Sequence, residues 1–307
     1  MEEKRSFGVR TVEAFLRLKG RLPLRYHYGW ARILAWLTGK VFHYRRDVVM
    51  ANLARSFPEM KYDQLKETAD RFYRHFANTI VEMIWFSACR GPKGRERLRQ
   101  SHIVEITNPD EMNRLYRGAR QLMILEAHTG NWELFGGILN YSYGTPLDTR
   151  ADAIAVTYNK LESALWNQVM ADNRTGPVAD LGFDGYVETY EVLRYVLARR
   201  EQKFTYSFIA DQYPYNHNMP HPTVDFLHRK TLAMSGGATL ACKLDMAVAF
   251  LRFRCREDGG YTMTFVPICD HAAGMDPQAI LQQYYSLLEE DLQAQPWNYL
   301  WTHKRWK

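Results

Sequence analysis

Apolar residues in the first hundred positions recur at helical spacing. Steps of three or four positions place a run of them on one face of a long helix: Leu65, Ala69, Phe72, Phe76, Ile80 and Ile84. A basic segment with turn residues, 90–94, closes this part of the chain. We therefore predict a helical, membrane-associating N-terminal portion over residues 1–100, with the apolar stripe facing the core.

After residue 100 the pattern changes to short apolar runs that alternate with helical stretches. The runs predict strands at 121–127, 153–158, 203–210, 248–254 and 261–268, and the intervening stretches predict helices at 131–141, 161–172, 235–244 and 277–293. Alternation of this kind predicts an α/β fold with a central mixed sheet flanked by helices on both faces. We expect this core to span residues 101–307 and to continue the helical portion as one domain.

The net charge and the cysteine content limit the kinds of binding partner and compartment that we expect for this protein. The 307-residue chain has a net charge of +6, which favours anionic partners such as a nucleic acid, an anionic lipid surface or an acidic carrier protein. Neither an Arg-rich nor a zinc-finger pattern selects nucleic acid, so we expect no nucleic-acid partner. The four cysteines form no C-x-x-C pair, which argues against a disulfide framework and a thiolate metal site and favours a reducing compartment.

The first apolar stretch, residues 29–42, is too short and too charged to span a bilayer, which takes roughly 20 apolar residues. Trp30 and Trp36 stand near Arg32 and Lys40, a combination that suits a helix lying in the lipid headgroup region. An ordinary core helix is an equal alternative. We interpret the protein as peripheral or shallowly anchored.

The run AHTGNWEL, residues 127–134, is the strongest candidate for chemistry. A predicted strand ends at its start and a helix begins near Asn131, so His128 lies at the carboxyl end of a strand, where α/β sheets bind ligands. Gly130 permits a sharp turn. A hydrogen bond from the imidazole to Glu133 would fix the tautomer and leave the other ring nitrogen as a base. Alternatively, Gly130 caps the helix and Glu133 closes back on its first turn without a catalytic role.

Other chemical motifs are absent from the sequence. It has no G-x-S-x-G nucleophile elbow and no glycine-rich nucleotide loop. His217 and His221 are four positions apart, but Pro220 and Pro222 exclude the helix that would align them. We therefore predict no metal site.

AHTGNWEL resembles the H-x-x-x-x-[DE] motif of glycerolipid-type acyltransferases, and the chain more narrowly resembles the late acyltransferases of lipid A biosynthesis. Further segments carry the resemblance in the family's order: YRRDVVMANLARSFPEM (44–60), RFYRHFANTIVEM (71–83), IADQYP (209–214) and QPWNYLWTHKRWK (295–307). The similarity spans about residues 20 to 307. Within it, Trp297-Asn298 stands where the family commonly has an acidic pair.

The resemblance implies a glycerolipid acyltransferase-like fold and an activity. An acyl chain would pass from a thioester of acyl carrier protein or coenzyme A to a hydroxyl of a lipid A precursor. Neither a cofactor nor a metal is implied. The expected location is the cytoplasmic face of the bacterial inner membrane, against an anionic lipid surface.

The family's residue roles carry over to matching positions. His128 would be the general base, Glu133 would orient it, and Asp211 would be a further acid needed for activity. Arg174 would hold an acceptor phosphate or the donor's phosphopantetheine, or be a solvated arginine at a helix end. Gly130 and Asn131 would shape the oxyanion region.

Two other functions remain open. The acceptor can instead be a lysophospholipid or an aminolipid, which would make the protein an O- or N-acyltransferase of another class. A membrane lipid-binding protein without catalysis would also use the basic charge and interfacial tryptophans. At the C-terminus, Tyr299 and Trp301 alternate like the inward face of a strand and are interpreted as structural, while the role of the basic residues beside them stays undecided.

Overall fold

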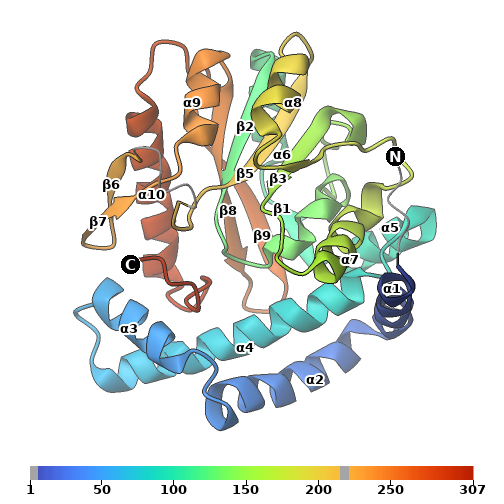
Figure 1. The fold of residues 1–307 in the computed structure, drawn as a ribbon, viewed down its shortest axis with the longest axis vertical. Coiled ribbons are helices and arrows are strands. Elements are labelled where there is room, and N and C mark those ends of the chain that lie inside the picture. Colours follow the sequence, from blue (N-terminus) through green and yellow to red (C-terminus); the bar gives the residue numbers. More distant parts are fainter. Residues whose placement is uncertain (1–5, 215–220, 307) are drawn as a thin grey trace.

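A seven-stranded mixed sheet forms the centre of the protein (Figure 1). The computed structural model describes residues 6–214 and 221–306. The strand order is β1-β9-β8-β2-β5-β3-β4, and every neighbouring pair is parallel except β8 and β9. The strands are β1 (Val104–Ile106), β2 (Gln121–Glu126), β3 (Ile154–Tyr158), β4 (Tyr186–Glu188), β5 (Phe204–Ile209), β8 (Ala247–Cys255) and β9 (Tyr261–Cys269). The predicted central mixed sheet is confirmed.

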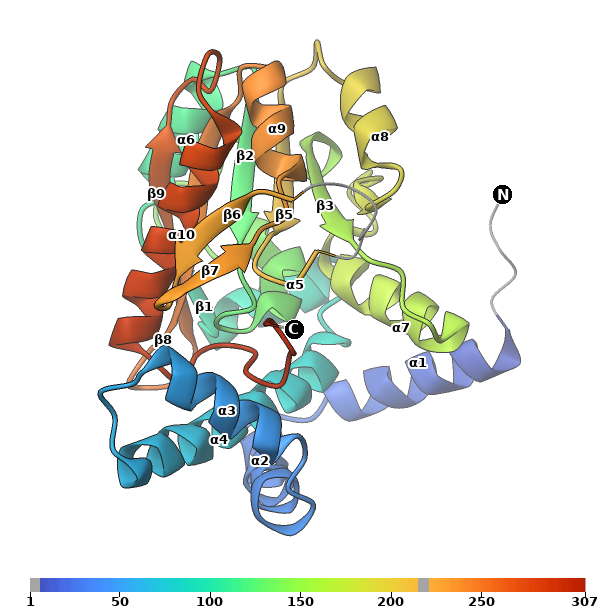
Figure 2. The same cartoon turned by 60° about the vertical axis from the view of Figure 1, so that its left-hand side comes forward.

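Helices cover both faces of this sheet (Figures 1 and 2). Along β2, Met123 and Leu125 pack into one core, while Leu122 and Ile124 pack into the other, as expected for a strand buried on both faces. One face carries α8 (Val192–Ala198), α9 (Gly236–Lys243) and α10 (Pro277–Ala294), and the other carries α6 (Pro109–Gly118). A separate hairpin, β6 (Thr223–Phe226) and β7 (Arg229–Leu232), packs against α10.

The described part of the N-terminal portion, residues 6–101, is largely helical, as predicted. They form α1 (Phe7–Gly20), α2 (Leu24–Trp36), a π-helical turn η1 (Leu37–Val41), α3 (Arg46–Ser56), α4 (Tyr62–Phe86) and α5 (Gly91–Ser101). The long helix α4 carries the predicted stripe, of which Leu65, Ala69 and Phe72 are buried in the core. The segment 90–94 is more than a closing turn, because α5 begins within it. Pro92 is tolerated there, since a residue in the first turn of a helix has no helical hydrogen bond from its backbone nitrogen to lose.

The remaining helical elements lie between β2 and β4 in the sequence. They are α7 (Ala164–Thr175) and three 3₁₀ segments, η2 (Trp132–Asn140), η3 (Ala151–Ala153) and η4 (Gly176–Val178). The predicted helices at 161–172, 235–244 and 277–293 are confirmed as α7, α9 and α10. The stretch 131–141 is 3₁₀ rather than α-helical.

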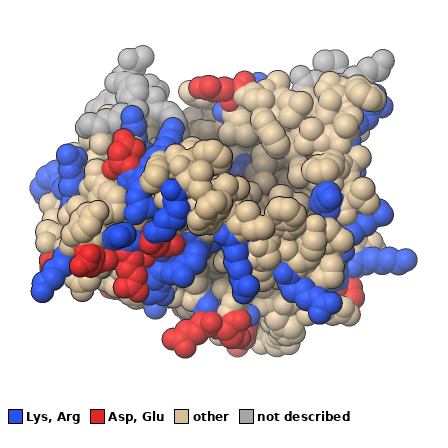
Figure 3. All heavy atoms as spheres, turned by 90° about the horizontal axis from the view of Figure 1, so that it is seen from below, with Lys and Arg blue, Asp and Glu red and all other residues tan. Residues whose placement is uncertain are grey.

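The first two helices carry much of the exposed apolar surface. Of the nineteen large hydrophobic side chains exposed among the described residues, ten lie between residues 7 and 44. Trp30 and Trp36 are 54% and 58% exposed, so the helix faces its tryptophans outward and buries only His27, Ala31 and Ala35. Within the described ranges, no helix has the length and apolar character needed to cross a bilayer. Figure 3 views the molecule from below, where Lys and Arg side chains are scattered among uncharged patches.

Candidate active site

A cavity of about 570 Å³ opens at the carboxyl ends of β2, β3 and β5. His128, Glu133 and Arg174 all line it. Much of the remaining wall is apolar and comes from η2, β3 and the segment after α7: Phe135, Ile138, Leu139, Ile154, Val156 and Val178. His128 and Glu133 therefore share one cavity, whose wall is largely apolar.

Strand register brings His128 to Asp211. In the parallel pair β2–β5, Glu126 lies opposite Ile209. His128 and Asp211 each come two residues after these positions. The Nδ1 atom of His128 lies 2.8 Å from Oδ1 of Asp211. The predicted hydrogen bond from His128 to Glu133 was wrong, because within the described structure the ring nitrogens bond to Asp211 and Gln212.

The Asp211 carboxylate determines the tautomer of the imidazole. Asp211 is 1% exposed, and burial alone would raise its pKa; the charge of His128 and the hydrogen bonds from its ring and backbone outweigh burial and lower the pKa. An ionised carboxylate only accepts hydrogen bonds, so Nδ1 of His128 carries the proton. Nε2 is then an acceptor, and it lies 3.1 Å from the amide nitrogen of Gln212.

Glu133 has a different partner, Arg174. The guanidinium donates from Nε and Nη2 to the two carboxylate oxygens, at 2.7 and 2.6 Å, and from Nη1 to the Tyr186 hydroxyl at 3.0 Å. Burial opposes ionisation of Glu133, but the charge and hydrogen bonds of Arg174 lower its pKa below the ordinary value. Arg174 is therefore not a solvated helix-end arginine; it is one half of a largely buried, two-point ion pair.

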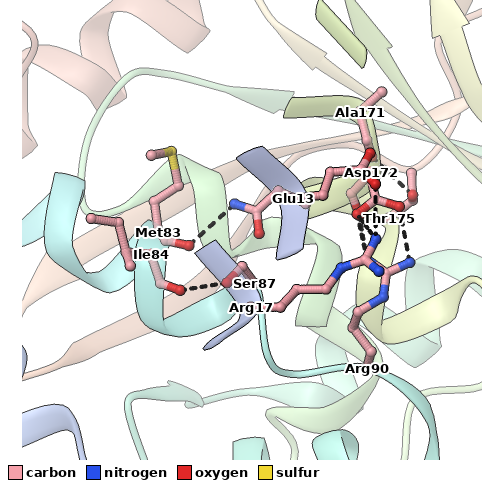
Figure 4. Close-up of polar contacts among 10 residues, drawn as sticks. Glu13, Arg17, Met83, Ile84, Ser87, Arg90, Ala171, Asp172 and Thr175 are labelled. Atoms are coloured by element: carbon pink, nitrogen blue, oxygen red, sulfur yellow. Dashed lines mark hydrogen bonds and ion pairs between the residues drawn. The ribbon is translucent and has the colours of Figure 1, made fainter. Parts of the chain in front are cut away.

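Helix α7, which carries Arg174, is fixed by further polar contacts. The carboxylate of Asp172 accepts hydrogen bonds from Arg17 of α1 and from Arg90 before α5 (Figure 4). Close backbone packing adds to this, since a Cβ atom on Gly136 of η2 would lie 1.8 Å from the carbonyl oxygen of Arg174. The guanidinium thus approaches Glu133 from a helix with little freedom to shift.

Gly130 and Asn131 shape the turn but do not line the cavity. Gly130 has φ +58°, and its N–H donates to Oδ1 of Asn298 at 2.7 Å. Asn131, not Gly130, caps η2, because its Oδ1 accepts from the N–H of Glu133 at 3.2 Å. Both residues are buried with their polar groups occupied by protein partners.

The C-terminal segment packs against the two turns that carry His128 and Asp211. Besides the contact from Asn298, the N–H of Leu300 donates to the carbonyl of His128 at 3.1 Å, and the Tyr299 hydroxyl donates to the carbonyl of Asp211 at 3.4 Å. Tyr299 and Trp301 are buried, which confirms a structural role for them, but the segment is irregular and not the strand suggested by their alternation. Arg305 is also buried and bonds to the Leu232 carbonyl.

Sequence reasoning missed a buried acid in the cavity wall. Glu126 is the last residue of β2, lines the cavity and accepts a hydrogen bond from Ser207. Burial raises its pKa to about 8, so this carboxyl group is protonated at neutral pH. The available signal was an acidic residue ending an otherwise apolar strand, QLMILE.

Metal-ligating side chains do not gather in the described part of the chain. Within residues 6–214 and 221–306, no three His, Cys, Asp or Glu side chains are placed to hold a metal ion. His221 lines the cavity, whereas His217 lies outside the described residues.

The site joins acid–base groups to an apolar cavity, a combination that suits an enzyme acting on an acyl chain. The family model described as bacterial lipid A biosynthesis acyltransferase matches residues 3–307. The chain therefore belongs to this family and is an acyltransferase of lipid A biosynthesis. A search of curated proteins gives no match to the chain.

The turn at Gly130 predicts a large cost for a single methyl group. In Gly130→Ala, the positive φ costs about 1–2 kcal/mol, and the new Cβ would lie 2.5 Å from the Phe253 ring, adding about 1–3 kcal/mol. Gly91→Ala is the matched control, because Gly91 has φ +61° but nothing within 4 Å of its Cβ position. Denaturant unfolding should find Gly130→Ala clearly less stable than Gly91→Ala; equal losses would contradict the contact with Phe253.

The buried Glu126 predicts a pH-dependent stability difference. The folded protein keeps the Glu126 proton up to about pH 8, whereas an unfolded chain releases it near the ordinary value of 4.5. The stabilising contribution is therefore complete below pH 4.5 and is lost as the pH rises toward 8. Glu126→Gln removes this titration, so its free energy of unfolding should rise relative to wild type by at least about 1 kcal/mol between pH 5 and 8.

Chemical denaturation at several pH values measures this difference. The exposed Glu257→Gln is the control, and its stability should run parallel to that of wild type. A Glu126→Gln curve that also runs parallel to wild type would show that Glu126 titrates alike in the folded and unfolded states.

Proposed function

We propose that the cavity is the place where an acyl chain passes from a carrier-protein or coenzyme A thioester to a hydroxyl of a lipid A precursor, with His128 as the general base. The observation that carries this proposal is the contact between His128 Nδ1 and the buried Asp211 carboxylate at 2.8 Å. Because Asp211 fixes the proton on Nδ1, Nε2 of a cavity-lining imidazole is left to accept a proton.

The transfer balances without a cofactor. Nε2 of His128 takes the hydroxyl proton, and the hydroxyl oxygen forms a bond to the thioester carbonyl carbon. The carbonyl electron pair moves to oxygen, returns as the carbon–sulfur bond breaks, and the departing thiolate takes the proton from the imidazolium. The Gln212 amide now occupies the Nε2 lone pair, so the acceptor hydroxyl must displace it.

Glu133 acts through Arg174 in this proposal. Its carboxylate accepts two N–H groups of the guanidinium, from Nε and Nη2, and the Tyr186 hydroxyl accepts a third, from Nη1. Arg174 retains two further N–H groups and lines the cavity, so it is the cationic donor available to a substrate phosphate or to the carbonyl oxygen as it gains charge. A guanidinium held on two sides needs little reorganisation to serve either purpose.

The assignment of donor and acceptor rests on chemistry around the cavity. The apolar wall from η2 and β3 suits a hydrocarbon chain. A net charge of +6 suits an acidic carrier protein and a phosphorylated lipid. A lysophospholipid or an aminolipid would meet the same groups, so these acceptors are alternative outcomes of the test below.

Membrane contact is proposed through the outward face of α1, α2 and η1. These three elements carry eight exposed apolar side chains, with basic residues between them. Aromatic and basic residues together favour the headgroup region of an anionic bilayer. We therefore propose peripheral binding at the cytoplasmic face of the inner membrane.

Acyl transfer should depend on the His128–Asp211 pair. With acyl carrier protein carrying a labelled chain, purified protein should acylate a lipid A precursor, detected by mass spectrometry. His128→Ala should lower kcat by at least about 10²-fold, and Asp211→Asn should also lower it by favouring the wrong tautomer.

His271→Ala supplies the matched control, since His271 pairs with Asp245 at 3.2 Å on the surface. It should retain full activity. Turnover only on a lysophospholipid or an aminolipid would reject the lipid A precursor as acceptor, and full activity of folded His128→Ala would reject the base.

Membrane binding should depend on α2. Replacing Ile33 and Trp36 with Ser removes two exposed apolar side chains, each worth about 1.5–3 kcal/mol when buried. Cosedimentation with anionic phospholipid vesicles should weaken at least about tenfold. Replacing Leu193 and Leu197 of α8, at the opposite end of the molecule in Figure 1, should have little effect. Equal weakening by both pairs would exclude α2 as the docking face.

A further inference from the structure

Another buried acid, Glu82 of α4, lies next to the turn that contains Asn131. Glu82 is 1% exposed and does not line the cavity. Across the described residues no Lys, Arg or His forms a salt bridge with it. Three neutral groups donate to it instead, and they come from three different parts of the fold.

These donors join α2, β9 and the turn before η2. The Tyr28 hydroxyl of α2 donates to Oε1 at 2.9 Å. Oε2 accepts from the Tyr261 hydroxyl of β9 at 2.7 Å and from the side-chain amide of Asn131 at 2.7 Å. Burial raises the pKa of Glu82 to about 7, and these three hydrogen bonds oppose that rise.

The contact with Glu82 determines which way the Asn131 amide points. The Asn131 amide nitrogen donates to Glu82 at 2.7 Å and, at a longer 3.4 Å, to the Thr79 carbonyl, so the amide turns its NH₂ toward α4 and its oxygen away. That oxygen accepts from the N–H of Glu133 at 3.2 Å. A flipped amide would put an NH₂ group against the Glu133 N–H, which would leave the first turn of η2 without its cap.

We propose that Glu82 is a positioning residue, which acts through Asn131 to fix the start of η2 and therefore the place of Glu133 and Arg174. This role rests on the proposed function. A purely structural need would not explain a carboxylate here, because well-packed apolar groups usually replace buried polar clusters with little loss of stability. The carboxylate supplies what an apolar side chain lacks, an acceptor that orients an amide.

Exchanging the carboxylate of Glu82 and the amide of Asn131 between their two positions tests the proposal. Asn131→Asp alone places two carboxylates together, which should distort the turn and lower kcat about 100-fold. Adding Glu82→Gln restores one carboxylate and one amide in exchanged places; the new amide can donate to the new carboxylate, which still accepts from the Glu133 N–H. The double variant should return kcat to within about tenfold of wild type. Glu82→Gln alone keeps an acceptor for Asn131 and should lose only a few-fold.

The matched control pairs Asn131→Asp with Glu67→Gln, which makes the same carboxylate-to-amide change at an exposed position of α4. This pair of substitutions should not restore kcat.

Unfolding by denaturant is measured on the same set of variants. If the double variant regains stability without regaining kcat, Glu82 is only structural and the positioning role is overturned. Equal kcat for Asn131→Asp with and without Glu82→Gln, in stable proteins, overturns it too. Absence of acyl transfer in wild type would instead reject the proposed function. The stability measurements would still show whether residues 82 and 131 interact.

Discussion

The register of two parallel strands is the constraint on which the active site depends. Glu126 of β2 lies opposite Ile209 of β5, so the chains leaving both strands carry His128 and Asp211 to one place. A shift of one residue would move one side chain to the other face of the sheet. Burial disfavours the Asp211 charge, and the charge and hydrogen bonds from His128 outweigh that cost. The imidazole therefore has a definite tautomer because the sheet has a definite register.

Two hydrogen-bonded pairs, rather than one dyad, organise the polar side of the cavity. Asp211 bonds to His128, and Glu133 bonds to Arg174 in a two-point contact. In each pair the electrostatic attraction and hydrogen bonds of the partner outweigh burial and lower the pKa of the carboxyl group, so both carboxylates stay ionised. Glu126, whose carboxyl group accepts a hydrogen bond from the neutral Ser207 hydroxyl, keeps its proton at neutral pH although it lines the same cavity. The protonation states of these three carboxyl groups are therefore set by the groups beside them.

The longer buried elements could be predicted from the sequence, and the shorter ones could not. Apolar runs such as QLMILE give β2, and the stripe on α4 gives a 25-residue helix. The strands β1 and β4 have three residues each, too few for a periodic pattern to emerge. Local spacing could locate the turn at Gly130, but it could not find the partner of His128, which is 83 positions away and is brought close only by strand pairing. The same holds for Arg174, 41 positions beyond Glu133.

The five-residue spacing between His128 and Glu133 acquires a different meaning in the folded protein. A left-handed residue at Gly130 and a cap at Asn131 start η2 immediately, and its first turn directs Glu133 toward α7. The spacing therefore sets the separation between two charged groups rather than a contact between them. Because Asn298 holds the Gly130 N–H and Leu300 holds the His128 carbonyl, the C-terminal segment keeps that separation constant. His128 and Arg174 therefore line one cavity at fixed places, which is the arrangement that the proposed transfer between a thioester and a phosphorylated lipid would use.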